Sequence, residues 1–575
     1  MVRRRQAVAL WRRLIHRFAA VWPEQPDTAD ELEDACRFVG APPAPVLVAA
    51  GNTLGIVVGA VGMGLGALAG QLTLLPLAAV LGTAPAVVFR HVPIGVARFA
   101  RTRALGESPA LFGRLTLRLR VEPSLERASR FAARSGDGRL ATALGDHVKR
   151  AQTTPQSGLQ SFATEWAEWE PALERASALV VDATAAPATA RTRGCERALE
   201  TVRSSVERQL GSFADDLRGP VTGLYAFGVL LPLALVGVLP AARIAGLQVG
   251  IGQLVVLYDL VLPLGLFGAG AWLLTRRPVA FPPPRVRSSH PEVPDRRLEA
   301  SAFGFGAAVA TAAGCHLVLP WATPIVAVGC GLGVGLYHYF EPRTSVREHV
   351  RAVEAGLPDA LALVGRRVGD GAAVEQALEA VSGELPGPTG ELLGEAAKTS
   401  RRLGIPLEAA FFGDDGVLAD LPSKRCRDAG TMLTLAATEG GPAGEVLVAA
   451  GDHLRQLQRA EAAGRRELAA VTGTLANTAV LFGPLVGGVT VAMVGGVSTA
   501  PATAAGGVGA TNFGAAVLGQ TVGVYVLALA AVLTAISTAL EHGLDRSLLG
   551  YRVGIALPTA TGAYVASVVA AGTIL

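Results

Sequence analysis

Long apolar stretches alternate with polar stretches along this chain. Residues 46–89 contain no charged side chain, and at about 20 residues per membrane-spanning helix this length predicts a hairpin of two spans. Similar apolar stretches predict hairpins within 220–275 and 301–340, and three further spans within 476–575. The hydrophobic pattern therefore predicts about nine transmembrane helices.

The two long polar stretches carry a helical pattern instead. In the second stretch, Val374, Ala377, Leu378 and Val381 follow the i, i+3, i+4, i+7 spacing of an amphipathic helix, and strand patterns are nearly absent. We therefore expect an all-α, polytopic membrane protein with two helical-bundle domains. In chain order, the expected segments are an N-terminal helix and linker (1–45), a first hairpin (46–89), a first helical domain (90–219), a second hairpin (220–275), a basic Pro-rich linker (276–300), a third hairpin (301–340), a second helical domain (341–475) and three C-terminal spans (476–575).

Glycine and proline mark helix ends in the second domain. Pro358 is expected at an early position of its first helix, where the missing N–H is harmless. Gly369 and Gly371 are expected to end that helix. Gly404 should end a later helix, and Pro406 should begin the next one, because glycine favours the left-handed turn at a helix end and proline cannot continue a helix.

Composition and charge fix the class and the expected orientation. Half of the 575 residues are hydrophobic, 17% are charged and the mean hydropathy is +0.41, which excludes an ordinary soluble protein. Under the nine-span interpretation, 50 of the 51 basic residues lie on one side, which we expect to be cytoplasmic. The N-terminus and both domains would be cytoplasmic and the C-terminus extracytoplasmic. Met1 to Trp22 can form a basic amphipathic helix that lies on membrane lipid or packs on the protein itself.

Motifs for catalysis are missing from the sequence. None of the three lysines follows a glycine, which excludes a Gly-Lys-Ser/Thr phosphate loop. The nine histidines have no metal-ligand spacing, the five cysteines form no Cys-x-x-Cys pair, and there is no Gly-x-Ser-x-Gly motif. We expect no enzymatic activity, no cofactor, no metal and no nucleic-acid partner. Asp259, the one acid inside a predicted span, remains open as part of an ion path or as a hydrogen-bonded packing residue.

The chain also repeats itself. Ser108-Pro109 parallels Leu357-Pro358, and Pro232 parallels Pro484, so each half reads as a hairpin, a helical domain and returning spans. Residues 90–219 hold 20 basic and 15 acidic side chains, whereas 341–471 hold 15 and 20. Opposite net charges could dock the duplicated domains side by side, or they could reflect drift of solvated faces.

The second domain resembles a known family. Leu357-Pro358, then Gly369-Asp370-Gly371 with Ala377-Leu378, then Gly404 with Pro406-Leu407, are similar to the cytoplasmic domain of the type II secretion system F domain family. Members of that family are membrane platforms of type IV pili, type II secretion systems and archaella. Two such domains on about nine spans resemble the archaeal-type platforms.

The resemblance implies a function and partners. It implies a non-enzymatic cell-membrane platform that couples a separate hexameric ATPase to the extraction of pilin subunits and to filament assembly, working as a homodimer or a higher oligomer. Arg366, Arg367, Arg401 and Arg402 are candidate partner contacts, although paired arginines also occur on solvated faces. A secondary transporter with duplicated halves is the alternative function.

Overall fold

The computed structural model describes most of the chain in two compact units, and every regular element in the described ranges is a helix. The first unit comprises Met1–Ala104 and Thr275–Val279, and the second comprises Leu105–Leu274 and Ala280–Leu575. Each unit is described by itself below. The described residues are 13–23, 26–68, 75–136, 138–151, 157–244, 250–277, 286, 290–439, 442–499 and 515–574.

The first unit is built on a helical hairpin. Helices α3 (Ala44–Leu68) and α4 (Leu75–Leu105) approach closely through glycines, since a side chain at Gly55 would meet the carbonyl oxygen of Gly82 at 2.5 Å. A short helix, α2 (Asp30–Val39), precedes them. Residues 13–19 are also helical, but most of the expected Met1–Trp22 helix lies outside the described residues.

The second unit contains two helical bundles. The first bundle has a core that includes Phe112, Leu144 and Phe162. The core of the second bundle includes Val364, Leu378 and Phe411. The helices of the first bundle are α5 (Ser108–Val121), α6 (Leu125–Arg134), α7 (Arg139–Arg150), α8 (Gly158–Ala167), α9 (Pro171–Ala185) and α10 (Ala188–Tyr225); those of the second are α15 (Thr323–Gly369), α16 (Val374–Glu384), α17 (Pro388–Leu403), α18 (Leu407–Phe412), α19 (Lys424–Glu439) and α20 (Pro442–Asn477).

The expected helix start at Pro358 is wrong. Helix α15 runs without a break from Thr323 to Gly369, and Pro358 lies inside it, fully within the packed core. The helix continues because its buried face is apolar on both sides of the proline. The other expected ends agree with the structure. Helix α15 stops at Gly369, Gly371 has φ +96°, Gly404 ends α17 with φ 63° and ψ 28°, and Pro406 is the N-cap of α18.

Eight helices among the described residues are long and apolar enough to cross a membrane, which fits an all-α, multi-pass membrane protein. The second span expected within 46–89 corresponds to α4, which begins at Leu75; residues 69–74 lie outside the described part. The remaining elements of the membrane part are η3 (Ala226–Leu230), α11 (Leu231–Ile244), α12 (Ile251–Val255), η4 (Val256–Val261), α13 (Leu262–Arg276), α14 (Arg297–Val318), η5 (Pro320–Ala322), η6 (Thr478–Phe482), α21 (Gly483–Thr499), α22 (Ala515–His542) and α23 (Arg546–Ile574).

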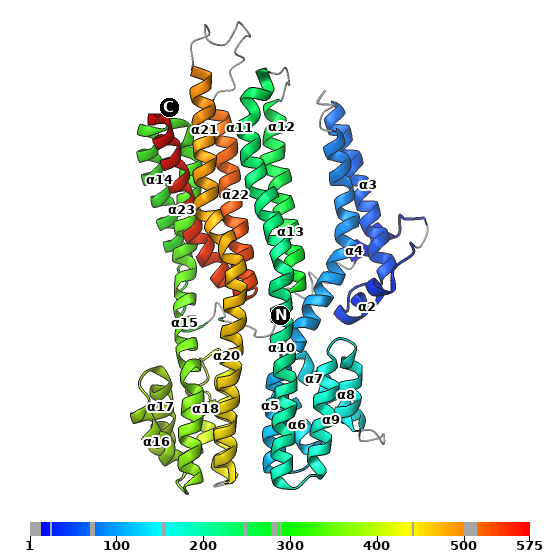
Figure 1. The fold of residues 1–575 in the computed structure, drawn as a ribbon, viewed down its shortest axis with the longest axis vertical. Coiled ribbons are helices and arrows are strands. Elements are labelled where there is room, and N and C mark those ends of the chain that lie inside the picture. The colour runs from blue at the N-terminus through cyan, green and yellow to red at the C-terminus, as the bar shows by residue number, and fades with distance from the viewer. Residues whose placement is uncertain are drawn as a thin grey trace. The chain divides into compact units, whose positions relative to one another are not determined.

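Three helices pass from a bundle into the membrane part with no loop. Helix α15 does so by itself, α10 continues through η3 into α11, and α20 continues through η6 into α21. Figure 1 shows α15 and α20 descending together from the membrane part into the second bundle, and α10 descending into the first. At about 1.5 Å per residue, the 50-residue stretch Pro320–Gly369 is about 75 Å long, far more than the ~30 Å of a bilayer core.

Candidate functional site

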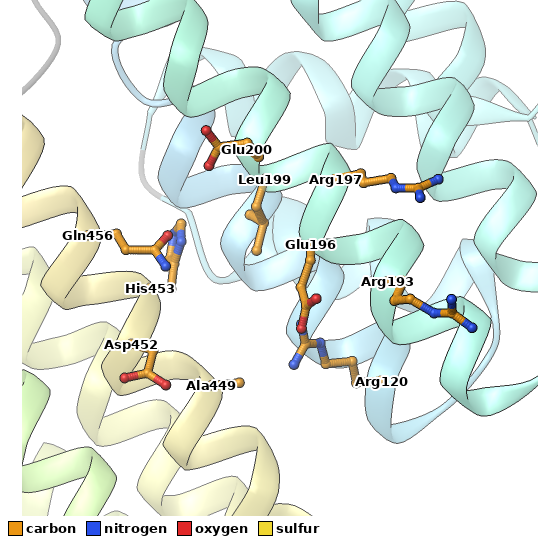
Figure 2. A pocket seen from close by; sticks show the side chains of 10 residues that line it. All are labelled: Arg120, Arg193, Glu196, Arg197, Leu199, Glu200, Ala449, Asp452, His453 and Gln456. Atoms are coloured by element: carbon orange, nitrogen blue, oxygen red, sulfur yellow. The ribbon is translucent and has the colours of Figure 1, made fainter.

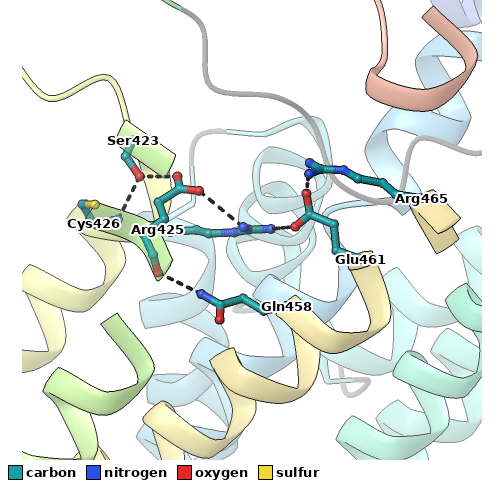
Figure 3. A network of polar contacts seen from close by, with 7 residues as sticks. Ser423, Arg425, Cys426, Gln458, Glu461 and Arg465 are labelled. Carbon is teal, nitrogen blue, oxygen red and sulfur yellow. Dashed lines mark hydrogen bonds and ion pairs between the residues drawn. The ribbon is translucent and has the colours of Figure 1, made fainter. Parts of the chain in front are cut away.

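A buried polar network joins three helices of the second bundle, α15, α19 and α20. The Ser423 hydroxyl donates to Glu354 at 2.6 Å, and Arg425 reaches Glu354 at 3.4 Å and Glu461 at 2.6 Å. Arg465 forms a further ion pair with Glu461 (Figure 3). The carboxylates of Glu354 and Glu461 are only 12% exposed. A charge in such a poorly hydrated site is costly unless it is paired, and both carboxylates are paired here.

The proline inside α15 explains one contact of this network. Pro358 has no N–H to offer the carbonyl of Glu354, four residues earlier. The side-chain amide of Gln458, on α20, donates to that carbonyl at 2.8 Å (Figure 3). A backbone acceptor that the proline leaves free thus becomes a bond between two long helices.

The network also sets the properties of its ionisable groups. Burial acts against the charge of Arg425, but Glu461 and Glu354 outweigh it, so the pKa of the guanidinium is raised. Burial raises the pKa of the neighbouring Cys426 thiol to about 12. The arginine therefore stays charged, and the cysteine stays a neutral thiol at physiological pH.

A second group of contacts ties α15 and α20 to the turn between α22 and α23. Arg347 binds Asp545 at 2.7 Å, with side chains only 3% and 15% exposed. Asp545 also accepts the backbone N–H of Ser547 at 2.9 Å and so caps α23. The hydroxyl of Thr472, on α20, donates to Glu541. These bonds fix the turn between two membrane helices to the base of the second bundle.

The two bundles contact each other through α5, α10, α19 and α20. Arg114 binds Asp428 at 3.0 Å, which joins the bundle of net positive charge to the one of net negative charge. Gly113 lies against His453, where an added Cβ would stand 2.8 Å from the ring Nε2. In the part of the chain that the structure describes, the two bundles thus lie side by side, in contact through the Arg114–Asp428 ion pair and close packing at Gly113.

A polar pocket of about 460 Å³ lies beside this contact (Figure 2). Arg120 binds Glu196 across its wall at 3.3 Å. Burial, with Arg120 and Arg203 nearby, lowers the pKa of His453 to about 4, so the ring is neutral at physiological pH. The lining residues are Arg120, Arg193, Glu196, Arg197, Leu199, Glu200, Ala449, Asp452, His453 and Gln456.

The four arginines named from the sequence lie at the ends of α15 and α17. Arg367 binds Glu384 at 2.5 Å and Arg401 binds Glu379 at 2.6 Å, so both hold α16 to its neighbours. Arg366 and Arg402 are exposed, and the Arg401 side chain is 67% exposed despite its ion pair, so all four arginines stay predicted partner contacts. The structure does not bring the four into one cluster with the buried network.

Asp259 lies in the π-helical segment η4. One of its oxygens, Oδ1, is buried without a hydrogen-bond partner in the described part of the chain. No group of three or more His, Cys, Asp or Glu side chains with metal-binding geometry occurs among the described residues.

Sequence reasoning missed the buried network and the Arg347–Asp545 pair. The available signal was the spacing of charges by three or four residues at Arg347, Arg351 and Glu354, and again at Glu461 and Arg465. An ordinary solvent-exposed helix shows the same spacing, so the sequence did not distinguish the two. Comparisons with protein families, curated proteins and solved structures found no match for this chain.

Proposed function

We propose that this chain is the membrane platform of a type IV pilus-like or type II secretion-like machine, as the resemblance of its second bundle to the F domain family implies. In this proposal both bundles are cytoplasmic, nine spans cross the cell membrane, and a separate hexameric ATPase moves the bundles. The membrane part receives that movement and helps to lift pilin subunits into a filament.

The observation that carries the proposal is the continuity of α10–α11, α15 and α20–α21. Hydrogen bonds link each turn of a helix to the next, so a displacement at the bundle end can pass along its length, and the π-helical segments η3 and η6 are the points where two of these helices can bend. The Glu354–Arg425–Glu461 network would keep α15 and α20 moving as one body. The Arg347–Asp545 pair would tie α15 to the turn between α22 and α23. A chain built for catalysis would instead need a cleft with reactive groups.

The proposed duplication has a counterpart in both halves. The segments η3 and η6 are each five residues long, each continues a long bundle helix, and each is followed by a proline, Pro232 and Pro484. The spacing between the two segments equals that between the two prolines. The two long helices that these segments continue, α10 and α20, also contact each other.

Two experiments test the platform function. Affinity purification from native membranes should recover the ATPase and pilin subunits. Arg402→Glu, on α17, should reduce ATPase recovery, while the control Arg466→Glu, an exposed change on α20, should not. Insertion of two glycines after Ala470 should leave ATPase binding intact and abolish filament assembly, because it loosens α20 between bundle and membrane. Normal filaments from a stable insertion variant would contradict the proposal that the continuous helix α20 transmits movement from the bundle to the membrane part.

The unpartnered oxygen of Asp259 supports a second candidate, a secondary transporter. Reconstituted vesicles would then show ion or solute flux that Asp259→Asn abolishes. The platform proposal expects no such flux, and filament assembly that survives the same substitution.

A further inference from the structure

Several guanidinium nitrogens near the base of the second bundle lack partners. Among the described residues, Nε and Nη2 of Arg347 and Nη2 of Arg351 are buried without a hydrogen-bond partner. Arg351 lies one turn after Arg347 on α15, and both lie close enough to Arg465, on α20, for mutual repulsion. A buried donor without an acceptor is costly, and a charged one is more so.

The nearby carboxylates are already engaged. Asp545 binds Arg347 through Nη1, Glu354 accepts from Ser423 and Arg425, and Glu461 binds Arg425 and Arg465. Glu541 accepts from Thr472. Burial, with Arg347 and Arg465 nearby, lowers the pKa of Arg351 to about 10, so it remains charged at physiological pH and an acceptor is still missing.

This basic cluster lies at the edge of the membrane part. His542 is the last residue of the candidate span Ala516–His542, and it lies within electrostatic reach of Arg347, Arg351, Arg465 and Arg552. Arg552 stands just before the apolar remainder of α23. Arg351 is only half-buried and the Arg465 side chain is 38% exposed, so an anion can approach from outside.

We propose that Arg351, together with Arg347 and Arg465, binds a phosphate group at the membrane boundary on the side of the helical bundles. A phosphate offers several strong acceptors, and guanidinium groups match its geometry in two-pronged hydrogen bonds. Basic sites between membrane helices at this level bind lipid head groups. The phosphate would come from an anionic phospholipid or from free phosphate, and it would join α15 to α20. This inference is independent of the machine that the protein serves.

The test uses the full-length protein in nanodiscs. The lipid arm compares phosphatidylcholine discs with and without phosphatidylglycerol. The free-phosphate arm adds inorganic phosphate to pure phosphatidylcholine discs, and sodium chloride of equal ionic strength is its control. Thermal unfolding midpoints and native mass spectrometry of retained lipid are the readouts. Arg351→Gln is the test variant, and Arg351→Lys keeps the charge if the former does not fold. Arg466→Gln is the control, since Arg466 is exposed and its side chain bonds to a carbonyl of its own helix.

Either phosphatidylglycerol or inorganic phosphate should raise the unfolding midpoint of the wild type. The apparent affinity for that ligand should be about tenfold or more lower in Arg351→Gln and unchanged in Arg466→Gln. The apparent affinity of Arg351→Lys should lie between those of the two variants, because lysine keeps the positive charge but cannot form the two-pronged hydrogen bonds of arginine. A response to phosphatidylglycerol alone identifies a lipid head group, and a response to inorganic phosphate identifies free phosphate. No response in either arm, or an equal loss in Arg466→Gln, overturns the proposal.

Discussion

Two prolines of this protein illustrate how a local defect becomes a tertiary contact. Pro358 leaves the carbonyl of Glu354 without its helical partner, and Gln458 donates to it. Pro232 does the same to the carbonyl of Gly228, four residues earlier, which accepts the hydroxyl of Tyr525 from α22. In a membrane part no water replaces the missing donor, so a neighbouring helix must supply one.

The Pro358 contact can be tested with a double-mutant cycle. Gln458→Met should destabilise the protein by ~1–2 kcal/mol because it leaves the Glu354 carbonyl buried and unpaired. In a Pro358→Ala background the same change should cost much less, since the alanine N–H can bind that carbonyl along the helix. Unfolding midpoints of the four proteins measure the coupling. Equal costs in both backgrounds would contradict the account.

Gly404 gives a second prediction for a single residue. Its φ of 63° lies in the left-handed region, and no atom lies within 4 Å of an added Cβ, so the only obstacle to a side chain is backbone strain. Gly404→Val should destabilise the second bundle by ~1 kcal/mol or more and shift α18. Gly404→Asn should be milder, because asparagine tolerates this conformation. Gly369→Ala, which has equal space and no positive φ, serves as the control. Hydrogen exchange of α18 measures the effect, and wild-type protection in Gly404→Val would refute it.

Long helices and the contacts between them are the main feature among the elements. Helix α20 contacts α15, α19 and α22, and it also packs on α5 and α10 of the other bundle. At the contact with α10, Leu210 lies against Gly464, where an added Cβ would come within 2.8 Å of the Leu210 side chain. The same helix therefore connects both bundles with the membrane part.

The ion pair between the bundles can be tested by exchanging its charges. Arg114→Asp or Asp428→Arg alone should weaken docking, because each places two like charges together in a largely buried contact. The double variant should recover much of the loss. Cross-linking yield between α5 and α19, with engineered cysteines, measures docking. Singles that dock as well as the wild type would show that packing at Gly113 and Gly464 alone holds the bundles.

The proposed topology is a prediction about the whole molecule. With nine spans, single cysteines at Ala380 and at Leu575, introduced into a variant without the five native cysteines, should react with impermeant reagents from opposite sides of the membrane. Inverted vesicles should expose position 380 and intact cells position 575. Labelling of both positions from the same side would rule out nine spans, and labelling of 380 from outside would reverse the orientation.

Hydrophobic periodicity was sufficient for the all-helical class and for helices of the second bundle, whereas the individual helices of the first bundle were not predicted. The buried face of α16, the left-handed turn at Gly404 and the start of α18 at Pro406 all depend on interactions within a few residues, which a sequence displays directly. Apolar length likewise marked the candidate membrane spans, because the thickness of the bilayer is a fixed requirement.

Only the tertiary structure showed that α15 runs from an apolar, membrane-length stretch into the second bundle as one unbroken helix. Local rules placed a helix start at Pro358, but core packing on both sides and the bond from Gln458 offset the missing N–H. The Glu354–Arg425–Glu461 network and the Arg347–Asp545 pair join residues from 36 to 198 positions apart. A charge at helical spacing looks the same whether it faces water or a buried partner, so these contacts arise only when the long helices come together.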